Sequence, residues 1–269
     1  MDTGKTYNIT LLGCGKMGRA MLDGWLSREI VNRVLVVDPH ESNVPDAPQI
    51  SYCADFPDHV ERYNDILVIA VKPQIIADAL DTVDLPDGMA VLSIAAGQSL
   101  DTLQSYFSGG TGIIRSMPNT PAAIGKGISV AIANEYVTDE QKTCAGLLLR
   151  AVGDVEWITN ENLMDAVTAL SGSGPAYVFY LIECLSQAGV DIGLDAGMAT
   201  KLARQTVIGS AALAEHDALV DASLLRKNVT SPNGTTQAAL DVLMDGRFQN
   251  ILLDTLRAAQ KRSVELNNT

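Results

Sequence analysis

The chain has 269 residues, 47% hydrophobic and 19% charged, which is typical of a globular protein with room for two domains of ordinary size. Its formal net charge of −13 argues against nucleic acid as a partner, because binding to phosphates would need a basic surface. The longest apolar runs are too short to cross a bilayer and the N-terminal segment lacks the pattern of a signal peptide, so we expect a cytoplasmic protein with no membrane partner.

The first part of the chain, residues 1–160, alternates short β-branched runs with helix-period segments. Asp65–Val71 is a continuous apolar run after its first residue, as expected of a strand buried on both faces. This alternation predicts an α/β domain with a doubly wound parallel sheet. Strands are predicted at Tyr7–Leu12, Arg33–Val37, Asp65–Val71, Ala90–Ala95, Gly112–Met117 and Ile128–Ala133, and helices at Lys16–Arg28, Gln74–Leu80 and Asp139–Val152.

The second part, residues 161–269, loses the strand pattern and predicts an all-helical domain. Its Ala-rich segments carry more apolar surface than about 110 residues can bury alone, which suggests helix exchange or packing between subunits. The expected helices are Asn162–Leu170, Pro175–Ala188, Ala196–Ala214, Thr235–Met244 and Phe248–Leu266.

A glycine-rich loop follows the first predicted strand and opens the first predicted helix, in the pattern Gly-x-Gly-x-x-Gly. In this context the pattern indicates dinucleotide binding, with the pyrophosphate on the helix N-terminus. Asp38 ends the second strand, where a carboxylate accepts the ribose hydroxyls of NAD and repels a 2′-phosphate; the alternative is the start of an exposed Asp-Pro turn. The candidate residues in the loop are Gly13, Gly15, Lys16, Met17 and Gly18, where Lys16 either offsets pyrophosphate charge or is simply solvated.

Three further strand ends carry small or rigid residues. Val71-Lys72-Pro73 places a lysine at the carboxyl end of a strand, where ligands of open α/β sheets bind, although a solvated lysine is an equal alternative. Ala95 and Ala96 leave space for a flat ring, and Met117–Pro121 forms a rigid turn. Three such ends in succession favour a cofactor cleft.

Two loops in the helical part pack glycine, proline and short hydroxyl side chains ahead of a helix: Leu170–Tyr177 and Val229–Thr236. Free backbone N–H groups there suit a small anionic ligand. Glu161 and Asp165, spaced i, i+4, either serve the site or complement a helix dipole. No catalytic triad, metal cluster or closely paired carboxylates stand out, and the four cysteines lack metal-ligand spacing. We therefore expect a dinucleotide-dependent enzyme whose small acid substrate meets its cofactor between two domains.

Ala169–Tyr177 and Lys227–Thr236 closely resemble the motifs of the pyrroline-5-carboxylate reductase family. The similarity covers nearly the whole chain, although its other motifs are shared more loosely with related dehydrogenases. It implies reduction of the cyclic imine 1-pyrroline-5-carboxylate to L-proline, the last step of proline biosynthesis, with hydride from NADPH or NADH. It also implies a Rossmann domain, a helical domain, and homodimers built by interleaving C-terminal helices, with decamers as a further assembly.

By this resemblance, the substrate carboxylate is held by Ser231, Gly234, Thr235 and Thr236. The Thr236 hydroxyl is expected to hydrogen-bond the ring nitrogen as the catalytic group, and Glu161 is expected near the substrate. Two departures stand out. Asn233 replaces a glycine of the family pattern, in a turn whose left-handed geometry Asn tolerates. Asp38 favours NADH on electrostatic grounds, whereas the family commonly uses NADPH, so the preference stays open.

Two other functions remain open from sequence. One is a reductase of the same architecture that acts on a different cyclic imine or on a β-hydroxy acid. A hydroxy-acid enzyme needs a lysine or histidine acid–base group in the helical domain, and Lys201 and Lys227, the obvious candidates, lie outside glycine-rich loops. The other is a non-catalytic dinucleotide sensor, which predicts cofactor binding without turnover and a degraded substrate loop.

Overall fold

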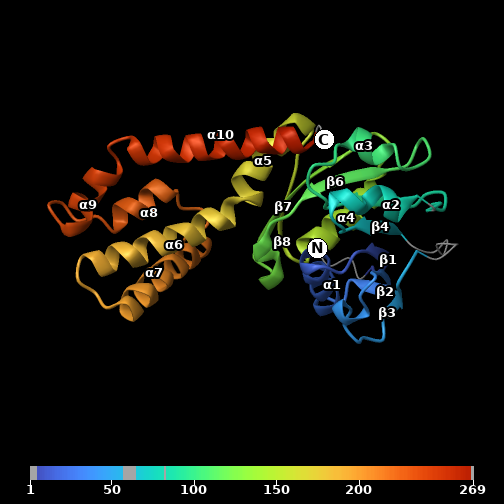
Figure 1. Cartoon of the computed structure of the whole chain (residues 1–269), viewed down its shortest axis with the longest axis horizontal. Coiled ribbons are helices and arrows are strands. Elements are labelled where there is room, and N and C mark those ends of the chain that lie inside the picture. Colours follow the sequence, from blue (N-terminus) through green and yellow to red (C-terminus); the bar gives the residue numbers. More distant parts are fainter. Residues whose placement is uncertain (1–4, 57–64, 82, 268–269) are drawn as a thin grey trace. The chain divides into compact units, whose positions relative to one another are not determined.

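The computed structural model describes residues 5–56, 65–81 and 83–267, shown in Figure 1. They form two compact units. The first unit runs to Gly172 and takes in the chain again from Ala259, and the second spans Ser173–Ala258.

The first unit is built on one sheet, whose described strands lie in the order β3-β2-β1-β4-β5-β6-β7-β8. The strands from β3 to β6 are parallel, β7 is antiparallel to β6, and β8 is parallel to β7. Their bounds are β1 Tyr7–Leu12, β2 Val31–Val37, β3 Ile50–Cys53, β4 Ile66–Ile69, β5 Ala90–Ser93, β6 Ile113–Met117, β7 Gly127–Ala133 and β8 Gly153–Trp157.

Helices cover both faces of this sheet, as a doubly wound fold requires. The side chains of β4 alternate between two hydrophobic clusters: Ile66 and Val68 belong to one, Leu67 and Ile69 to the other. The first cluster includes residues of α1 and α4, and the second includes residues of α2 and α3. The helical segments are α1 Lys16–Ser27, α2 Ile76–Leu80, α3 Leu100–Gln104, α4 Asp139–Arg150 and α5 Met164–Val167, with short 3₁₀ turns at Glu41–Asn43 (η1), Pro73–Ile75 (η2), Thr120–Ile124 (η3) and Glu161–Leu163 (η4).

The second unit is helical. The long helices α6 and α7 pack together, and a Cβ on Gly189 would lie only 3.1 Å from Cβ of Ala199, so this glycine permits a close approach of the two helices. Many apolar side chains of α6 remain exposed, among them Phe179, Tyr180 and Leu181. The helices are α6 Gly174–Asp191, α7 Ala196–His216, α8 Ala222–Asn228, α9 Thr235–Leu243 and α10 Arg247–Asn267, the last of which ends in the first unit.

The structure departs from the sequence prediction in local detail. The predicted helix Asn162–Leu170 is divided into η4, α5 and a π-helical turn at Thr168–Gly172, and the predicted loop at Leu170–Tyr177 is mostly helical. The strand β7 runs against its neighbour because the short connection from β6 is a single 3₁₀ turn, and a parallel crossover needs a dozen or more residues. None of the described helices combines the length and hydrophobicity of a membrane span.

Candidate active site

Three of the predicted segments meet at one edge of the sheet, the carboxyl edge of its parallel strands. Strand register pairs Leu12 with Ile69, and Ile69 with Ser93, so β1, β4 and β5 end side by side. The glycine-rich loop, residues 70–73 and residues 95–97 follow these ends directly. The strand β1 lies between β2 and β4, where the strand order reverses, and such a switch point is where ligands of open α/β sheets bind.

The glycine-rich loop is tightly packed at its two ends and open in its middle. Gly13 has φ +94°, and a Cβ there would lie 2.6 Å from Cγ1 of Val71. A Cβ on Gly18 would lie 2.2 Å from the carbonyl oxygen of Gly13, whereas a Cβ on Gly15 would meet nothing within 4 Å. The turn therefore requires glycine at positions 13 and 18, and at Gly15 the backbone is accessible to a ligand.

The N-terminus of α1 faces the same edge with free donors. Gly15 is the N-cap residue and makes no side-chain capping bond, and the first turn carries no acidic residue. Unpaired N–H groups and the positive end of a helix dipole bind phosphate groups well, so this loop fits the pyrophosphate of a dinucleotide. Lys16 is exposed and Met17 is half-buried.

Asp38 is buried at the end of β2, with 6% of its surface exposed. Its Oδ2 accepts a hydrogen bond from the backbone N–H of Cys14 at 2.7 Å, and its Oδ1 accepts one from the N–H of His40 at 2.9 Å. The carboxylate therefore contacts the glycine-rich loop and also closes a turn over Pro39 and His40, both of which are exposed. Burial and the charge of Asp38 raise the pKa of the Cys14 thiol to about 11, so this thiol stays protonated at neutral pH.

The two other strand ends present small and exposed groups beside the loop. Val71 is half-buried, Lys72 is exposed, and Pro73 begins the turn η2. Ala95 is buried, with 6% of its surface exposed, and Ala96 is exposed. The small side chains of Ala95 and Ala96 leave room for a flat ring at the end of β5.

Glu161 lies in the first unit, at the start of η4. Its Oε1 accepts a hydrogen bond from the backbone N–H of Leu100 at 2.8 Å and pairs with Nη1 of Arg115 at 2.6 Å. The side chain of Arg115 is only 6% exposed, so this ion pair provides a buried guanidinium with a partner. Glu161 therefore links η4 to β6 and to the N-terminus of α3.

The predicted substrate loop lies in the second unit, before α9. Asn233 has φ +57°, so it adopts the left-handed geometry expected of the residue that replaces glycine there. The N–H of Gly234 donates to the carbonyl of Ser231 at 3.0 Å, which closes the turn. Gly234 is the N-cap of α9 and makes no side-chain capping bond, so the first-turn donors, including those of Thr235 and Thr236, have no side-chain cap.

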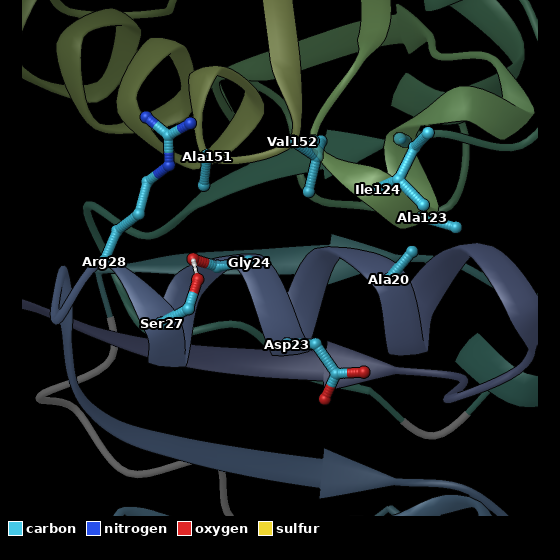
Figure 2. A pocket seen from close by; sticks show the side chains of 11 residues that line it. Ala20, Asp23, Gly24, Ser27, Arg28, Ala123, Ile124, Ala151 and Val152 are labelled. Carbon is cyan, nitrogen blue, oxygen red and sulfur yellow. Dashed lines mark hydrogen bonds between the residues drawn. The ribbon is translucent and has the colours of Figure 1, made fainter.

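A separate cavity of about 330 Å³ lies beside α1, η3 and the end of α4 (Figure 2). Figure 2 shows Arg28 beside Ala151 and the hydroxyl of Ser27 bonded to the carbonyl of Gly24 at 3.0 Å. The residues that line this cavity include none of the site residues predicted from the sequence.

Comparison with known proteins shows relatives along nearly the whole chain. A pyrroline-5-carboxylate reductase from Synechocystis sp. is 39% identical over 97% of this chain and 98% of its own, and one from Arabidopsis thaliana is 35% identical over 98% and 97%. The solved structure of a pyrroline-5-carboxylate reductase from Coxiella burnetii has a TM-score of 0.87 at 32% identity, covering 98% of this chain and 100% of that one. This chain belongs to the pyrroline-5-carboxylate reductase family.

Two family models match separate parts of the chain. The model "NADP oxidoreductase coenzyme F420-dependent" matches residues 8–97, and "Pyrroline-5-carboxylate reductase dimerisation" matches residues 161–266. A Plasmodium falciparum pyrroline carboxylate reductase solved with NADP bound has a TM-score of 0.81 at 28% identity and covers 98% of this chain and 99% of that one. For this member of the pyrroline-5-carboxylate reductase family, the predicted fold, the NAD(P)-dependent oxidoreductase class and an oligomeric state are confirmed.

Several residues that organise the site of this reductase-family chain were not predicted from the sequence. Arg115 was visible in principle, because an arginine inside the buried strand Ile113–Met117 needs a charged partner. Asn267, which like Ser263 donates to Oδ1 of Asp165 at 2.7 Å, gave no such signal. Polar residues near the end of an amphipathic helix are usually solvated, and their partner lies 98 and 102 residues away.

Proposed function

We propose that this chain reduces the C=N bond of 1-pyrroline-5-carboxylate to give L-proline, the last step of proline biosynthesis. The observation that carries the proposal is the identity of 33–39% to curated pyrroline-5-carboxylate reductases, most of it spanning nearly the full chain. When bound, NADPH or NADH supplies the hydride. The geometry of the glycine-rich loop and of the loop before α9 supports a site for one dinucleotide and one small anion.

At the cofactor end, we assign the pyrophosphate to the N-terminus of α1. Gly13 and Gly18 hold the turn, Gly15 leaves the backbone open, and Lys16 offsets phosphate charge, with Met17 beside it. We assign the nicotinamide end to the two neighbouring strand ends, where small side chains leave room for a ring. The residues of this second group are Val71, Lys72, Pro73, Ala95 and Ala96.

Asp38 takes the ribose end in this proposal. Its carboxylate already accepts from the N–H groups of Cys14 and His40 and from Nδ2 of Asn43, and a carboxylate has about four acceptor positions, so it can also accept a ribose hydroxyl. A negative charge at this point repels a 2′-phosphate, which favours NADH over NADPH. Members of the family commonly use NADPH, which favours the opposite preference. The ratio of the activity with NADPH to the activity with NADH decides between the two cofactors.

At the substrate end, the uncapped N-terminus of α9 binds the carboxylate of the imino acid. The backbone N–H of Thr235 and the hydroxyls of Ser231 and Thr236 supply hydrogen bonds to an anion at a helix N-terminus, and Gly234, whose own N–H is bonded to Ser231, holds the turn that presents them. The Asn233 turn preserves the left-handed geometry of this loop. Glu161 stays a proposed neighbour of the substrate, with its Oε1 already shared between Leu100 and Arg115.

The reduction does not need a strong general acid from the protein. A cyclic imine becomes more electrophilic on protonation, and solvent provides that proton. Hydride transfer then requires the imine carbon to lie about 3–3.5 Å from the donor carbon of the nicotinamide. Holding the carboxylate of the imino acid and the nicotinamide each in its own site provides this near-attack geometry. The Thr236 hydroxyl orients the ring nitrogen and stabilises the product amine by a hydrogen bond.

We further propose that residues 1–160 act as the cofactor domain and residues 161–269 as the substrate and dimerisation domain of a cytoplasmic homodimer. The exposed apolar side chains of α6 and the match to a dimerisation model support interleaved helices between two copies. Decamers built from such dimers are the further assembly that we propose.

The test is turnover with racemic pyrroline-5-carboxylate and either NADPH or NADH. We expect substrate-dependent loss of the reduced cofactor, with one L-proline formed for each cofactor oxidised. Folded protein that binds the cofactor yet forms no proline would contradict the proposal, and it would move the assignment to another imine or to a sensor.

A further inference from the structure

The C-terminal turn of α10 packs against the loop that follows β5. From Ala259 onward the chain belongs to the same compact unit as the sheet. A Cβ placed on Gly97 would lie 3.6 Å from the carbonyl oxygen of Leu266 and 3.8 Å from Oδ1 of Asn267. The end of the helix therefore faces Gly97 across a gap that one added side-chain carbon would fill, directly after Ala95 and Ala96.

One carboxylate oxygen holds this turn in place. Oδ1 of Asp165 accepts hydrogen bonds from the hydroxyl of Ser263 and from Nδ2 of Asn267, each 2.7 Å long. Ser263 and Asn267 are four residues apart, so both lie on one face of α10, and Ser263 is buried there with 8% of its surface exposed. The buried Oδ1 of Asn267 has no donor among the described residues, so this amide is held through Nδ2. Hydrogen bonds to an ionised carboxylate are about twice as strong as neutral ones.

The η4–α5 segment, which carries Asp165, also holds the far end of the loop that follows β5. Glu161, four residues before Asp165, accepts the backbone N–H of Leu100 and pairs with the buried Arg115. The stretch from Ala95 to Leu100 is thus fixed at one end by Glu161 and covered at Gly97 by the turn that Asp165 anchors. The η4–α5 segment therefore bonds both the loop after β5, through Glu161, and the C-terminal turn of α10, through Asp165.

We propose that Asp165 is a positioning residue for the cofactor: by anchoring Ser263 and Asn267, it keeps the C-terminal turn of α10 against Gly97 and fixes the loop that receives the nicotinamide end of NADPH or NADH. This inference rests on the cofactor role proposed for Ala95 and Ala96. Asp165 acts through the loop and not on the reacting atoms, so its loss weakens cofactor binding more than it slows the chemical step.

The experiment is direct binding of NADPH and of NADH to the full-length protein, followed by nicotinamide fluorescence. Asp165→Ala removes the acceptor, and Ser263→Ala with Asn267→Ala removes both donors. We expect each change to raise Kd about tenfold, and the combination of all three to add little, because the residues form one network. Asp165→Asn keeps an acceptor oxygen in the same place and is expected to recover most of the affinity.

Arg262→Ala is the matched control. Arg262 neighbours Ser263, is 66% exposed and pairs with Glu265 of the same helix, so its loss leaves Kd unchanged. If Asp165→Ala does not fold, Ser263→Ala alone carries the test, with an expected rise in Kd of about threefold. Folded Asp165→Ala or Ser263→Ala protein that binds both cofactors like the wild type overturns the proposal.

A kinetic measurement separates positioning from general destabilisation. In Asp165→Ala the KM for the cofactor should rise with Kd, while kcat at saturating cofactor and the KM for the imine stay near the wild-type values. A fall in kcat with an unchanged cofactor KM would contradict a positioning role. Because binding is measured without the imine, wild-type protein that fails to reduce pyrroline-5-carboxylate contradicts the proposed function and leaves the binding comparison intact.

Discussion

At the scale of single residues, Asp38 combines two roles that a pair of substitutions separates. Its carboxylate accepts the N–H of Cys14 in the glycine-rich loop, and it places negative charge at the ribose end of the proposed cofactor site. Asp38→Ser removes the charge, so we expect the ratio of NADPH to NADH activity (kcat/KM) to rise by about tenfold or more.

Asp38→Asn is the companion variant, because it removes the charge and also turns an NH₂ group toward backbone donors. We expect it to weaken both cofactors, since either the Cys14 or the His40 bond is lost. An unchanged NADPH-to-NADH ratio in Asp38→Ser would mean that the carboxylate serves the loop and not the choice of cofactor.

Thr236 tests how much the substrate loop contributes to the chemistry. We expect Thr236→Ala to lower kcat by about tenfold without abolishing it, because a hydrogen bond to the ring nitrogen is lost and solvent still provides the proton. Thr236→Ser keeps the hydroxyl and should restore most of the rate. The half-buried Thr255 of α10, whose hydroxyl donates to the carbonyl of Ile251 in its own helix, provides Thr255→Ala as the matched control. Complete loss of turnover in folded Thr236→Ala would instead make the hydroxyl an essential proton donor.

At the scale of elements, the loop between β1 and α1 offers a matched pair of glycines. A Cβ on Gly18 would meet the carbonyl of Gly13 at 2.2 Å, so Gly18→Ala forces the turn apart. We expect at least about a hundredfold loss of cofactor affinity together with a lower thermal midpoint. Gly15 has φ −67° and open space around its Cβ position, so Gly15→Ala should fold with a wild-type midpoint.

Cofactor titration of Gly15→Ala then tests the pyrophosphate assignment. If the ligand approaches the backbone at this point, the added methyl group should raise Kd while stability is unaffected. Wild-type binding in Gly15→Ala would remove the pyrophosphate from this part of the loop.

Most elements of the first unit could be predicted because their signals are local. The run at 66–69 is apolar on both faces, and the glycine loop sits between a clear strand and a clear helix. The strands β3 and β8 were missed for a physical reason: both lie at the edges of the sheet, and neither has a fully buried residue. Their alternation of polar and apolar residues over four or five positions is too short to predict a strand.

The site could be predicted only in part, for a related reason. Glycine loops and strand ends follow from local pattern, and their convergence follows from the order of parallel strands. The partners of Glu161 and Asp165 depend on contacts between distant segments, such as Arg115 on β6 and Ser263 on α10. No periodicity in one sequence reports such pairs.

At the scale of the whole molecule, the second unit exposes more apolar surface than a stable monomer tolerates. Its helices have few buried residues: none in α6, α8 or α9, and Ala199 and Ala203 in α7. We expect the mass in solution, measured by light scattering after size exclusion, to be at least twice the 28.6 kDa of the chain. A monomer at micromolar concentration would contradict the proposed interleaving of helices.

The proposed reaction transfers a hydride from a reduced nicotinamide to the imine carbon of pyrroline-5-carboxylate. Reduction with NADPH or NADH deuterated at C4, on the transferred face, tests it most directly by mass spectrometry of the proline formed. We expect L-proline with a single deuterium at C5, and no deuterium when the unlabelled cofactor is used. Proline without deuterium, or label that appears at another carbon, would contradict it.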